Sequence, residues 1–255
     1  MDVEGAPRRM RIGRVPIDSV TFAEAIDAID ALVASGQGGT VFTPNVDHVV
    51  QAEENERFRD AYAAAALSLV DGMPVLWASR LMGSPLPEKV SGSDLVVPLL
   101  ERAAKRGWRV FFLGGLPGAA EEARDLLVAR IPGLQIVGID SPMINVDGAT
   151  SSHDAVVTVL REARPDLVLV ALGAPKQELF SHAIAERMRP AVLVGVGGTL
   201  DFIAGKVRRA PPWMSASGLE WLYRLAQEPR RMWRRYLVRD PKFLLILLRE
   251  LRRPR

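Results

Sequence analysis

Residues 166–198 read DLVLVALGAPKQELFSHAIAERMRPAVLVGVGG, and this stretch decides the fold class. Two apolar runs, at 166–173 and 191–198, flank a segment at 176–189 that is compatible with an amphipathic helix. Near-continuous apolar runs are typical of strands that are covered on both faces, as in a parallel sheet. The stretch therefore predicts a strand–helix–strand unit with two parallel strands.

The same rhythm extends through the middle of the chain. An earlier helix is expected to begin at Thr21, where TFAE matches a capping box. Further apolar runs occur at 39–45, 67–72, 108–115 and 134–140, and further helices are predicted at 92–106, 117–130 and 153–164. This alternation favours an α/β fold, a Rossmann-like, mostly parallel sheet with helices on both faces.

The composition is that of a globular chain long enough for one α/β domain and an appendage. Its 255 residues include no cysteine, which excludes disulfide scaffolds, thiolate metal sites and cysteine nucleophiles, and which suits a reducing cytoplasm. The first residues, MDVEGAPRRMRIGRV, lack the apolar core of a secretory signal. Since no apolar run approaches the roughly 20 residues needed to span a bilayer, we expect no transmembrane helix.

Charge is distributed unevenly along the chain. Residues 206–255 contain 14 Lys/Arg and 4 Asp/Glu, whereas residues 1–205 contain 19 and 26. The segment KVRRAPPWM (206–214) ends the strand–helix rhythm, and helix-compatible pieces separated by Pro229 and Pro241 follow it. We therefore predict a Rossmann-like core over 1–205 and a basic helical appendage over 206–255. Such an appendage is expected to meet an anionic partner: nucleic acid, acidic lipid or a diphosphate.

Polar residues follow several of the predicted strands. Thr43 and Asn45 follow the first strand, Asp71 the second and Gln177 the fifth. Ligands of open α/β sheets bind beyond the carboxyl ends of the strands, so these side chains are expected to share one site. Each has a structural alternative. Asp71 could cap the helix after it, Thr43 and Asn45 could cap a helix at 46–55, and Gln177 could serve only the start of its helix.

The turn FFLGGLPGAAEEA (111–123) supports a different hypothesis. It joins a strand to a helix through glycines, and its backbone N–H groups could hold a phosphate. Asp140 ends the next strand, where a dinucleotide-binding fold places its ribose-binding acid. The glycine spacing is not G-x-G-x-x-G. An NAD-dependent oxidoreductase therefore stays open as an alternative.

Metal-dependent and serine-hydrolase sites find no support in the sequence. His48, His153 and His182 are too scattered for local metal-ligand spacing, and no Asp-x-Asp pair occurs. The chain also lacks the G-x-S-x-G nucleophile elbow of a hydrolase.

Five segments together resemble one known family. They are TPNVDHVV (43–50), LVDGMPVLWASRLMG (69–83), FFLGG (111–115), GAPKQE (173–178) and GVGGTLDFIAGKVRRAPPWMSASGLEWLYRLAQEPRRMWRRYL (195–237). The chain resembles the WecG/TagA/CpsF glycosyltransferases, family 26, over roughly residues 10–240, and the last segment is the most specific. Members of this family transfer a sugar, commonly N-acetylmannosamine or its uronic acid, from UDP to a polyprenyl-diphosphate-linked sugar with inversion.

The resemblance implies a role for each candidate residue. Asp71 would be the catalytic base, with the apolar segment that includes Trp77 and Leu81 as the low-dielectric wall that raises its pKa. Thr43, Asn45 and Gln177 would line the sugar and acceptor pocket. The remaining candidates would contact the nucleotide or its diphosphate: Asp201, Lys89, Arg209, Arg224 and Arg231.

Two features qualify these implied roles. Without an Asp-x-Asp pair to hold a metal, cationic side chains from the appendage must offset the charge of the leaving UDP, and we expect no metal or other cofactor. Lys89 stands where the family commonly has arginine, so it keeps the charge but loses the bidentate fork.

The implied acceptor is membrane-bound, such as GlcNAc-diphosphate-undecaprenol, so the protein is expected in the cytoplasm on the inner face of the cytoplasmic membrane. The apolar run 243–248, flanked by Lys242 and arginines, suits peripheral attachment to acidic lipid. No nucleic-acid partner is expected, although a non-catalytic nucleic-acid binder is the second alternative. Appendages and sheet edges of this kind can also mediate self-association, so a homo-oligomer stays open.

Overall fold

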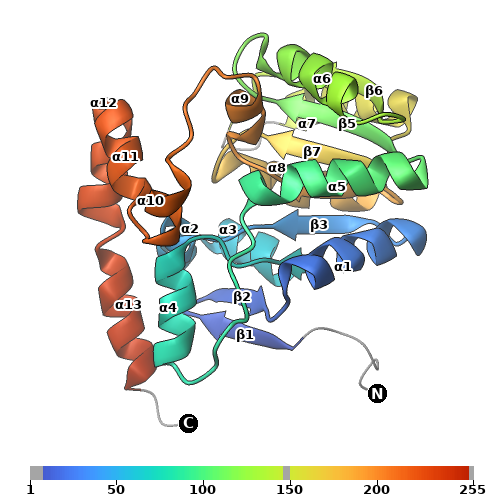
Figure 1. The fold of residues 1–255 in the computed structure, drawn as a ribbon. Helices are drawn as coiled ribbons and strands as arrows, with labels where there is room; N and C mark the ends of the chain where they lie inside the picture. Colours follow the sequence, from blue (N-terminus) through green and yellow to red (C-terminus); the bar gives the residue numbers. More distant parts are fainter. Residues whose placement is uncertain (1–7, 146–149, 253–255) are drawn as a thin grey trace, which may run out of the picture.

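The computed structural model of the protein describes residues 8–145 and 150–252, and its centre is a six-stranded parallel sheet. The strand order is β4-β3-β8-β7-β5-β6 (Figure 1). Along the chain the strands are β3 (Gly39–Phe42), β4 (Leu67–Ser68), β5 (Arg109–Gly114), β6 (Gln135–Asp140), β7 (Leu167–Ala171) and β8 (Val192–Gly195). Each lies within one of the apolar runs, and the prediction of an α/β fold with a parallel sheet is confirmed.

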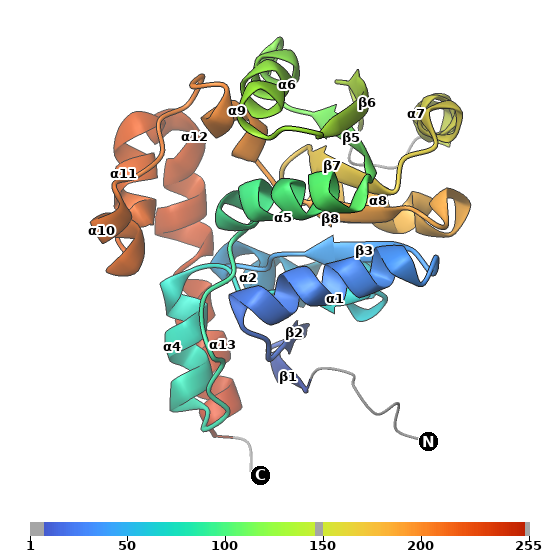
Figure 2. The same ribbon diagram turned by 45° about the vertical axis from the view of Figure 1, so that its right-hand side comes forward.

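The pleat of the strands explains why their sequences are apolar throughout. Val110 and Phe112 of β5 pack into the core on one face, and Phe111 and Leu113 pack on the other, because successive side chains point to opposite faces. Helices cover both faces (Figure 2). One face carries α1 (Phe22–Ala34), α5 (Gly92–Arg106), α6 (Ala119–Arg130) and α9 (Thr199–Ile203). The other carries α2 (Val46–Glu54), α3 (Glu56–Ala63), α7 (Thr150–Ala163), α8 (Lys176–Ile184) and the 3-10 turn η1 (Ala185–Met188).

The N-terminal part contains one confirmed feature and two that sequence reasoning missed. Helix α1 begins at the Thr21 capping box, as predicted. Helix α3 was not expected, and neither was the antiparallel hairpin of β1 (Arg9–Ile12) and β2 (Val15–Asp18). The carboxylate of Asp18 accepts the backbone N–H of Ser68 at 2.8 Å, which attaches the hairpin to β4.

The segment after residue 205 folds into short helices beside the carboxyl ends of the strands (Figure 1). They are α10 (Pro212–Ala216), α11 (Glu220–Gln227), α12 (Pro229–Trp233), the π-helical η2 (Arg234–Arg239) and α13 (Lys242–Leu251). We call residues 206–252 the C-terminal helical segment. Pro229 opens α12 and Pro241 precedes α13, in agreement with the predicted breaks.

Helix α13 is attached to the core by both charge and burial. Arg249 pairs with Glu53 of α2 at 2.6 Å, and Phe243 and Ile246 are buried in the same cluster as the β1–β2 hairpin. In both views α13 lies beside α4 (Met73–Leu81) (Figures 1 and 2). Across 8–145 and 150–252, every helix is too short or too polar to cross a bilayer.

Candidate active site

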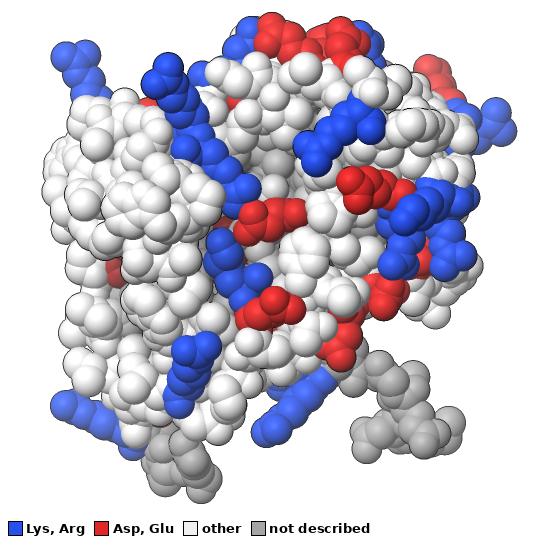
Figure 3. All heavy atoms as spheres, viewed as in Figure 1, with Lys and Arg blue, Asp and Glu red and all other residues white. Residues whose placement is uncertain are grey.

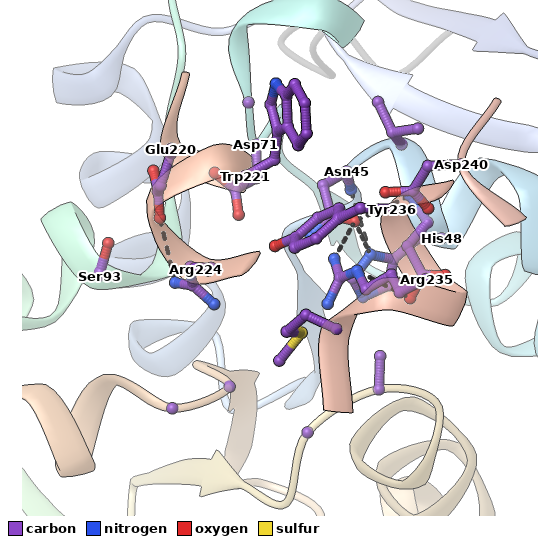
Figure 4. Close-up of a pocket in the computed structure, with 18 of the residues that line it drawn as sticks. Asn45, His48, Asp71, Ser93, Glu220, Trp221, Arg224, Arg235, Tyr236 and Asp240 are labelled. Atoms are coloured by element: carbon purple, nitrogen blue, oxygen red, sulfur yellow. Dashed lines mark hydrogen bonds and ion pairs between the residues drawn. The ribbon is translucent and has the colours of Figure 1, made fainter. Parts of the chain in front are cut away.

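A cavity of about 970 Å³ lies between the carboxyl ends of the strands and the C-terminal helical segment. One wall consists of the loops that follow β3, β4, β7 and β8, and the opposite wall consists of side chains from α11, α12 and η2. Figure 4 shows Asp71 and Asn45 from the first wall facing Trp221, Arg224 and Tyr236 from the second. The two parts of the chain that the sequence singled out separately therefore enclose one space.

Eight of the nine predicted site residues line this cavity. They are Thr43, Asn45, Asp71, Lys89, Gln177, Asp201, Arg224 and Arg231. Arg209 is not among the lining residues, and its guanidinium pairs instead with Asp94 of α5. The preceding residue, Arg208, lines the cavity in its place. The roles of all these residues remain predictions.

Backbone hydrogen bonds place Asp71 next to the loop that carries Asn45. The N–H of Asp71 donates to the carbonyl of Pro44 at 2.9 Å, and the N–H of Val90 donates to the carbonyl of Val70 at 2.8 Å. Gly72 follows with φ of 92°, a conformation that favours glycine. These two backbone hydrogen bonds and the conformation of Gly72 place the Asp71 carboxylate in the cavity wall.

The helix-cap alternative for Asp71 is wrong. Gly72 is the N-cap of α4, and no side chain makes a capping hydrogen bond there. Within the part of the chain that the structure describes, the Asp71 carboxylate has no hydrogen-bond or ion-pair partner, although the residue is largely buried. Burial raises its pKa to about 6, with the nearby Glu220 adding to the rise and Lys89, Arg224 and His48 opposing it.

The expected source of that burial needs a correction. Trp77 and Leu81 of α4 are 42% and 64% exposed and do not line the cavity. They lie farther along the helix, whereas Met73 and Pro74 at its start are lining residues. The periodicity of α4 could not show which turn of the helix faces the site.

For Asn45 the capping alternative is confirmed, but it is only part of what the side chain does. Asn45 is the N-cap of α2, and its Oδ1 accepts the N–H of Asp47 at 3.1 Å. The same oxygen accepts from Arg235 Nη2 at 3.2 Å and lies 2.7 Å from His48 Nδ1 (Figure 4). A residue expected at a helix start is thus also a joint between the core and the C-terminal helical segment.

Gln177 does not serve the start of its own helix. Its Oε1 accepts the N–H of Gly197 in the loop after β8 at 2.9 Å, and its Nε2 donates to Glu178 Oε1 at 2.8 Å. A Cβ on Gly195 would lie 2.9 Å from the Gln177 amide, so a larger residue there would displace this side chain. Gln177 is 3% exposed and holds two of the strand-end loops together.

The glycine turn after β5 is hydrogen-bonded to α9, the helix that follows the last strand. The N–H of Leu116 donates to Asp201 Oδ1 at 2.8 Å, which occupies one of the donors that a phosphate would need. Asp140, the candidate ribose-binding acid, ends the edge strand β6 and is not among the lining residues. The two observations on which the oxidoreductase alternative depended therefore do not meet in this cavity.

The predicted cations of the cavity are already paired with neighbouring acids. Arg224 pairs with Glu220 at 3.1 Å and lies over the Phe202 ring at 5.1 Å from its centroid. Arg231 pairs with Glu228 at 2.8 Å, and Lys89 with Asp94 at 3.3 Å. An anionic ligand would have to compete with or share these carboxylates.

Sequence reasoning missed several side chains of the second wall, namely Arg208, Glu220, Trp221, Arg235, Tyr236 and Asp240. All lie within or just after the segment 195–237, which was recognised as specific. The Glu220 and Arg224 spacing of four residues on one helix was the available signal. Among the described residues, no group of three or more His, Asp or Glu side chains could hold a metal ion.

The comparisons with known proteins agree with this architecture. The model of the WecG/TagA/CpsF glycosyl transferase family matches residues 10–255. The chain belongs to this family. It is 35% identical over 213 residues to an N-acetylglucosaminyldiphosphoundecaprenol N-acetyl-beta-D-mannosaminyltransferase of Bacillus spizizenii, covering 84% of this chain and 80% of that protein. The equivalent enzyme of Bacillus subtilis is 33% identical with the same coverage. The prediction of a glycosyltransferase is thereby confirmed.

Proposed function

We propose that this glycosyltransferase moves N-acetylmannosamine, or its uronic acid, from UDP to a GlcNAc-diphosphate-polyprenol such as the undecaprenol form, with inversion and without a metal ion. The observation that carries the proposal is the Asp71 carboxylate, which has no hydrogen-bond or ion-pair partner among the described residues and faces cationic side chains across the cavity. The two Bacillus relatives are named for this acceptor and for a β-linked N-acetylmannosamine product. Inversion gives that linkage from an α-linked UDP donor.

In the proposed reaction Asp71 acts as general base. It takes the proton of the acceptor hydroxyl as that oxygen attacks the anomeric carbon, and the bond from this carbon to the UDP oxygen breaks on the opposite face. The leaving diphosphate carries the electron pair, and Arg224, Arg231 and Lys89 offset its charge. A pKa of about 6 suits the base, because Asp71 is ionised at neutral pH yet accepts a proton more readily than an ordinary aspartate.

The surface beside the cavity supports a lipid-linked acceptor. Leu244 lines the cavity and is 63% exposed, and Leu245 and Leu248 continue the apolar face of α13. Trp77 and Leu81 of the adjacent α4 are exposed as well. Figure 3 shows this side of the molecule as a largely uncharged surface with Lys and Arg at its margins. We propose that this face rests on the cytoplasmic leaflet, where such an arrangement favours attachment.

A transfer assay with a panel of UDP-sugars and a short-chain GlcNAc-diphosphate-polyprenol tests the function. We expect one UDP-sugar, carrying N-acetylmannosamine or its uronic acid, to yield a β-linked disaccharide product and free UDP, with no loss of rate in EDTA. Loss of rate in EDTA that Mg²⁺ restores would contradict metal independence. Calorimetry that found tight binding of NAD and none of UDP would contradict the proposal as a whole.

A further inference from the structure

A chain of polar side chains runs from the cavity wall into the core, and the proposed reaction does not explain it. His48 of α2 is at its centre, with Nδ1 2.7 Å from Asn45 Oδ1 and Nε2 3.3 Å from Glu178 Oε1. The His48 side chain is 7% exposed and the Glu178 side chain is fully buried. Phe58 stacks on the imidazole with the ring centroids 5.8 Å apart. Both ring nitrogens therefore face oxygen atoms, and the imidazole is largely shielded from solvent.

The atom of Asn45 that faces His48 is identified by its other neighbours. The N–H of Asp47 and Nη2 of Arg235 both point at it, at 3.1 Å and 3.2 Å, so it is the amide oxygen and not the amide nitrogen. An oxygen 2.7 Å from Nδ1 requires a proton between the two atoms. The competing contact, the N–H of Asn45 to Nδ1, is longer at 3.2 Å. His48 is therefore expected to donate from Nδ1.

The other nitrogen faces an acceptor too. Glu178 Oε1 already accepts a hydrogen bond from Gln177 Nε2 at 2.8 Å. When His48 Nε2 is protonated, the same carboxylate oxygen also faces this second donor, at 3.3 Å. A fully buried carboxylate needs a positive partner close by, because its desolvation is otherwise uncompensated. Arg235 and Arg239 pair with Asp47 instead, and among the described residues the ion pair of Glu178 is with His48. His48 is the cation placed to compensate Glu178.

This arrangement fixes how Asn45 presents itself to a ligand. Its Oδ1 is occupied by Asp47, Arg235 and His48, while its Nδ2 has no hydrogen-bond partner among the described residues and Asn45 lines the cavity. We propose that His48, doubly protonated and paired with Glu178, is a positioning residue that holds Asn45 with its amide N–H groups toward the cavity and joins it to Arg235. Asn45 then acts on substrate as a hydrogen-bond donor only, which suits a sugar hydroxyl, an acetyl carbonyl or a phosphate oxygen.

The protonation state can be observed directly, since the chain has only three histidines. We expect ¹⁵N-edited NMR of the full chain at pH 7.5 to show one histidine with both ring nitrogens protonated, absent in His48→Gln. Glu178→Gln should convert that histidine to a singly protonated form. This variant is expected to fold because His48 can release its proton. The matched control is His182→Gln, an exposed position on α8. A singly protonated His48 in the unaltered protein would overturn the inference.

The consequence for binding rests on the proposed function and is tested with Asn45→Asp. Aspartate keeps the oxygens that accept from Asp47, His48 and Arg235 but removes the donors, so we expect kcat/KM to fall about tenfold to a hundredfold with doubly protonated His48 retained. Unchanged kcat/KM would contradict the donor role. An unaltered protein that is inactive with every UDP-sugar, yet shows doubly protonated His48, would defeat the proposed function and leave the His48–Glu178 pair standing.

Discussion

The two walls of the cavity are constructed in different ways. The strand-end loops hold their polar residues through hydrogen bonds to one another. The N–H of Gly197 donates to Gln177 Oε1 at 2.9 Å, and the N–H of Asp71 donates to the carbonyl of Pro44 at 2.9 Å. On the C-terminal helical segment, Arg224 and Arg231 pair with acids one helical turn away, and both arginine side chains keep substantial exposure. Surface pairs of this kind contribute little to stability. The first wall is therefore fixed by the fold, whereas the second is free to exchange its partners for a ligand.

The two walls also differ in how their residues meet solvent. Asp71 is largely shielded from solvent and has no side-chain hydrogen bond or ion pair among the described residues, and burial raises its pKa to about 6. The C-terminal helical segment leaves Leu245, Leu248 and Trp213 exposed at 69%, 49% and 64%. Exposed apolar patches of this kind mark surfaces that bind a membrane or another partner. The following experiments test that contrast.

The largest effect is expected from Asp71→Asn. Removal of a general base should lower kcat by about two to four orders of magnitude. The pKa of Asp71 in the folded state is about 6, above the ordinary 3.8, so the free energy of unfolding falls as pH rises between these values. The neutral amide should therefore raise the free energy of unfolding by up to about 3 kcal/mol at pH 7. Transfer rate and urea unfolding measure the two effects. Asp125→Asn, at an exposed position of α6, is the control. An Asp71→Asn variant with unchanged kcat would contradict the role of Asp71 as the base.

The next largest effect concerns the apolar face of α13. Replacing Leu245 and Leu248 together by Gln should reduce partitioning onto acidic vesicles about a hundredfold, since each buried leucine contributes roughly 1.5 kcal/mol or more. Neither residue lines the cavity, so turnover of a water-soluble acceptor should be unchanged. Leu126→Gln with Val128→Gln on α6, also exposed, is the matched control. Equal vesicle binding of both variants would contradict the proposed membrane face.

A smaller effect is expected at Arg224. Arg224→Gln removes one charged hydrogen-bond donor to the leaving diphosphate, which should lower kcat/KM about tenfold to thirtyfold. Because its ion pair with Glu220 is only partly buried, the free energy of unfolding should change by less than about 1 kcal/mol. Arg230→Gln is the control, since Arg230 does not line the cavity. A loss of stability that matched the loss of activity would show that Arg224 is structural.

The smallest effect is expected at Glu220. The Glu220 charge helps to raise the pKa of Asp71, so Glu220→Gln should lower that pKa and move the acid limb of the kcat/KM profile to lower pH. Glu228→Gln is the matched control, because Glu228 also lines the cavity and pairs with an arginine but is not among the charges that shift Asp71. An unchanged acid limb in Glu220→Gln would show that another group controls it.

Part of the structure followed from local sequence. The strands were recognisable by their apolar runs, because β3, β5, β7 and β8 bury nearly all of their side chains and the edge strand β6 is half-buried. The start of α1 was recognisable because its Thr21 capping box is a contact between residues three apart. The β1–β2 hairpin was not recognisable. It contains Pro16 and alternating charges, and its attachment to the sheet depends on Asp18 bonding to Ser68, far away in the chain.

The candidate site shows the same division. The position of Asp71 after an apolar strand, and the specific segment at 195–237, were enough to nominate the chemistry. The sequence could not show which of Arg208 and Arg209 reaches the cavity, because both lie in an irregular segment before α10 in which Arg208 lines the cavity and Arg209 pairs with Asp94. Nor could the sequence show that His48, dismissed as a metal ligand, lies between Asn45 and Glu178.

The α/β class and the family could be read from the sequence, because both depend on residue types at fixed spacings along the chain. Which side chains share the cavity followed from the tertiary structure, and so did the position of the Asp71 carboxylate, which has no hydrogen-bond or ion-pair partner within 8–145 and 150–252. Asp71 and Glu220 are 149 positions apart, yet the charge of one shifts the pKa of the other across the cavity. Electrostatic interaction and burial depend on distance in space, and the folded chain alone fixes those distances.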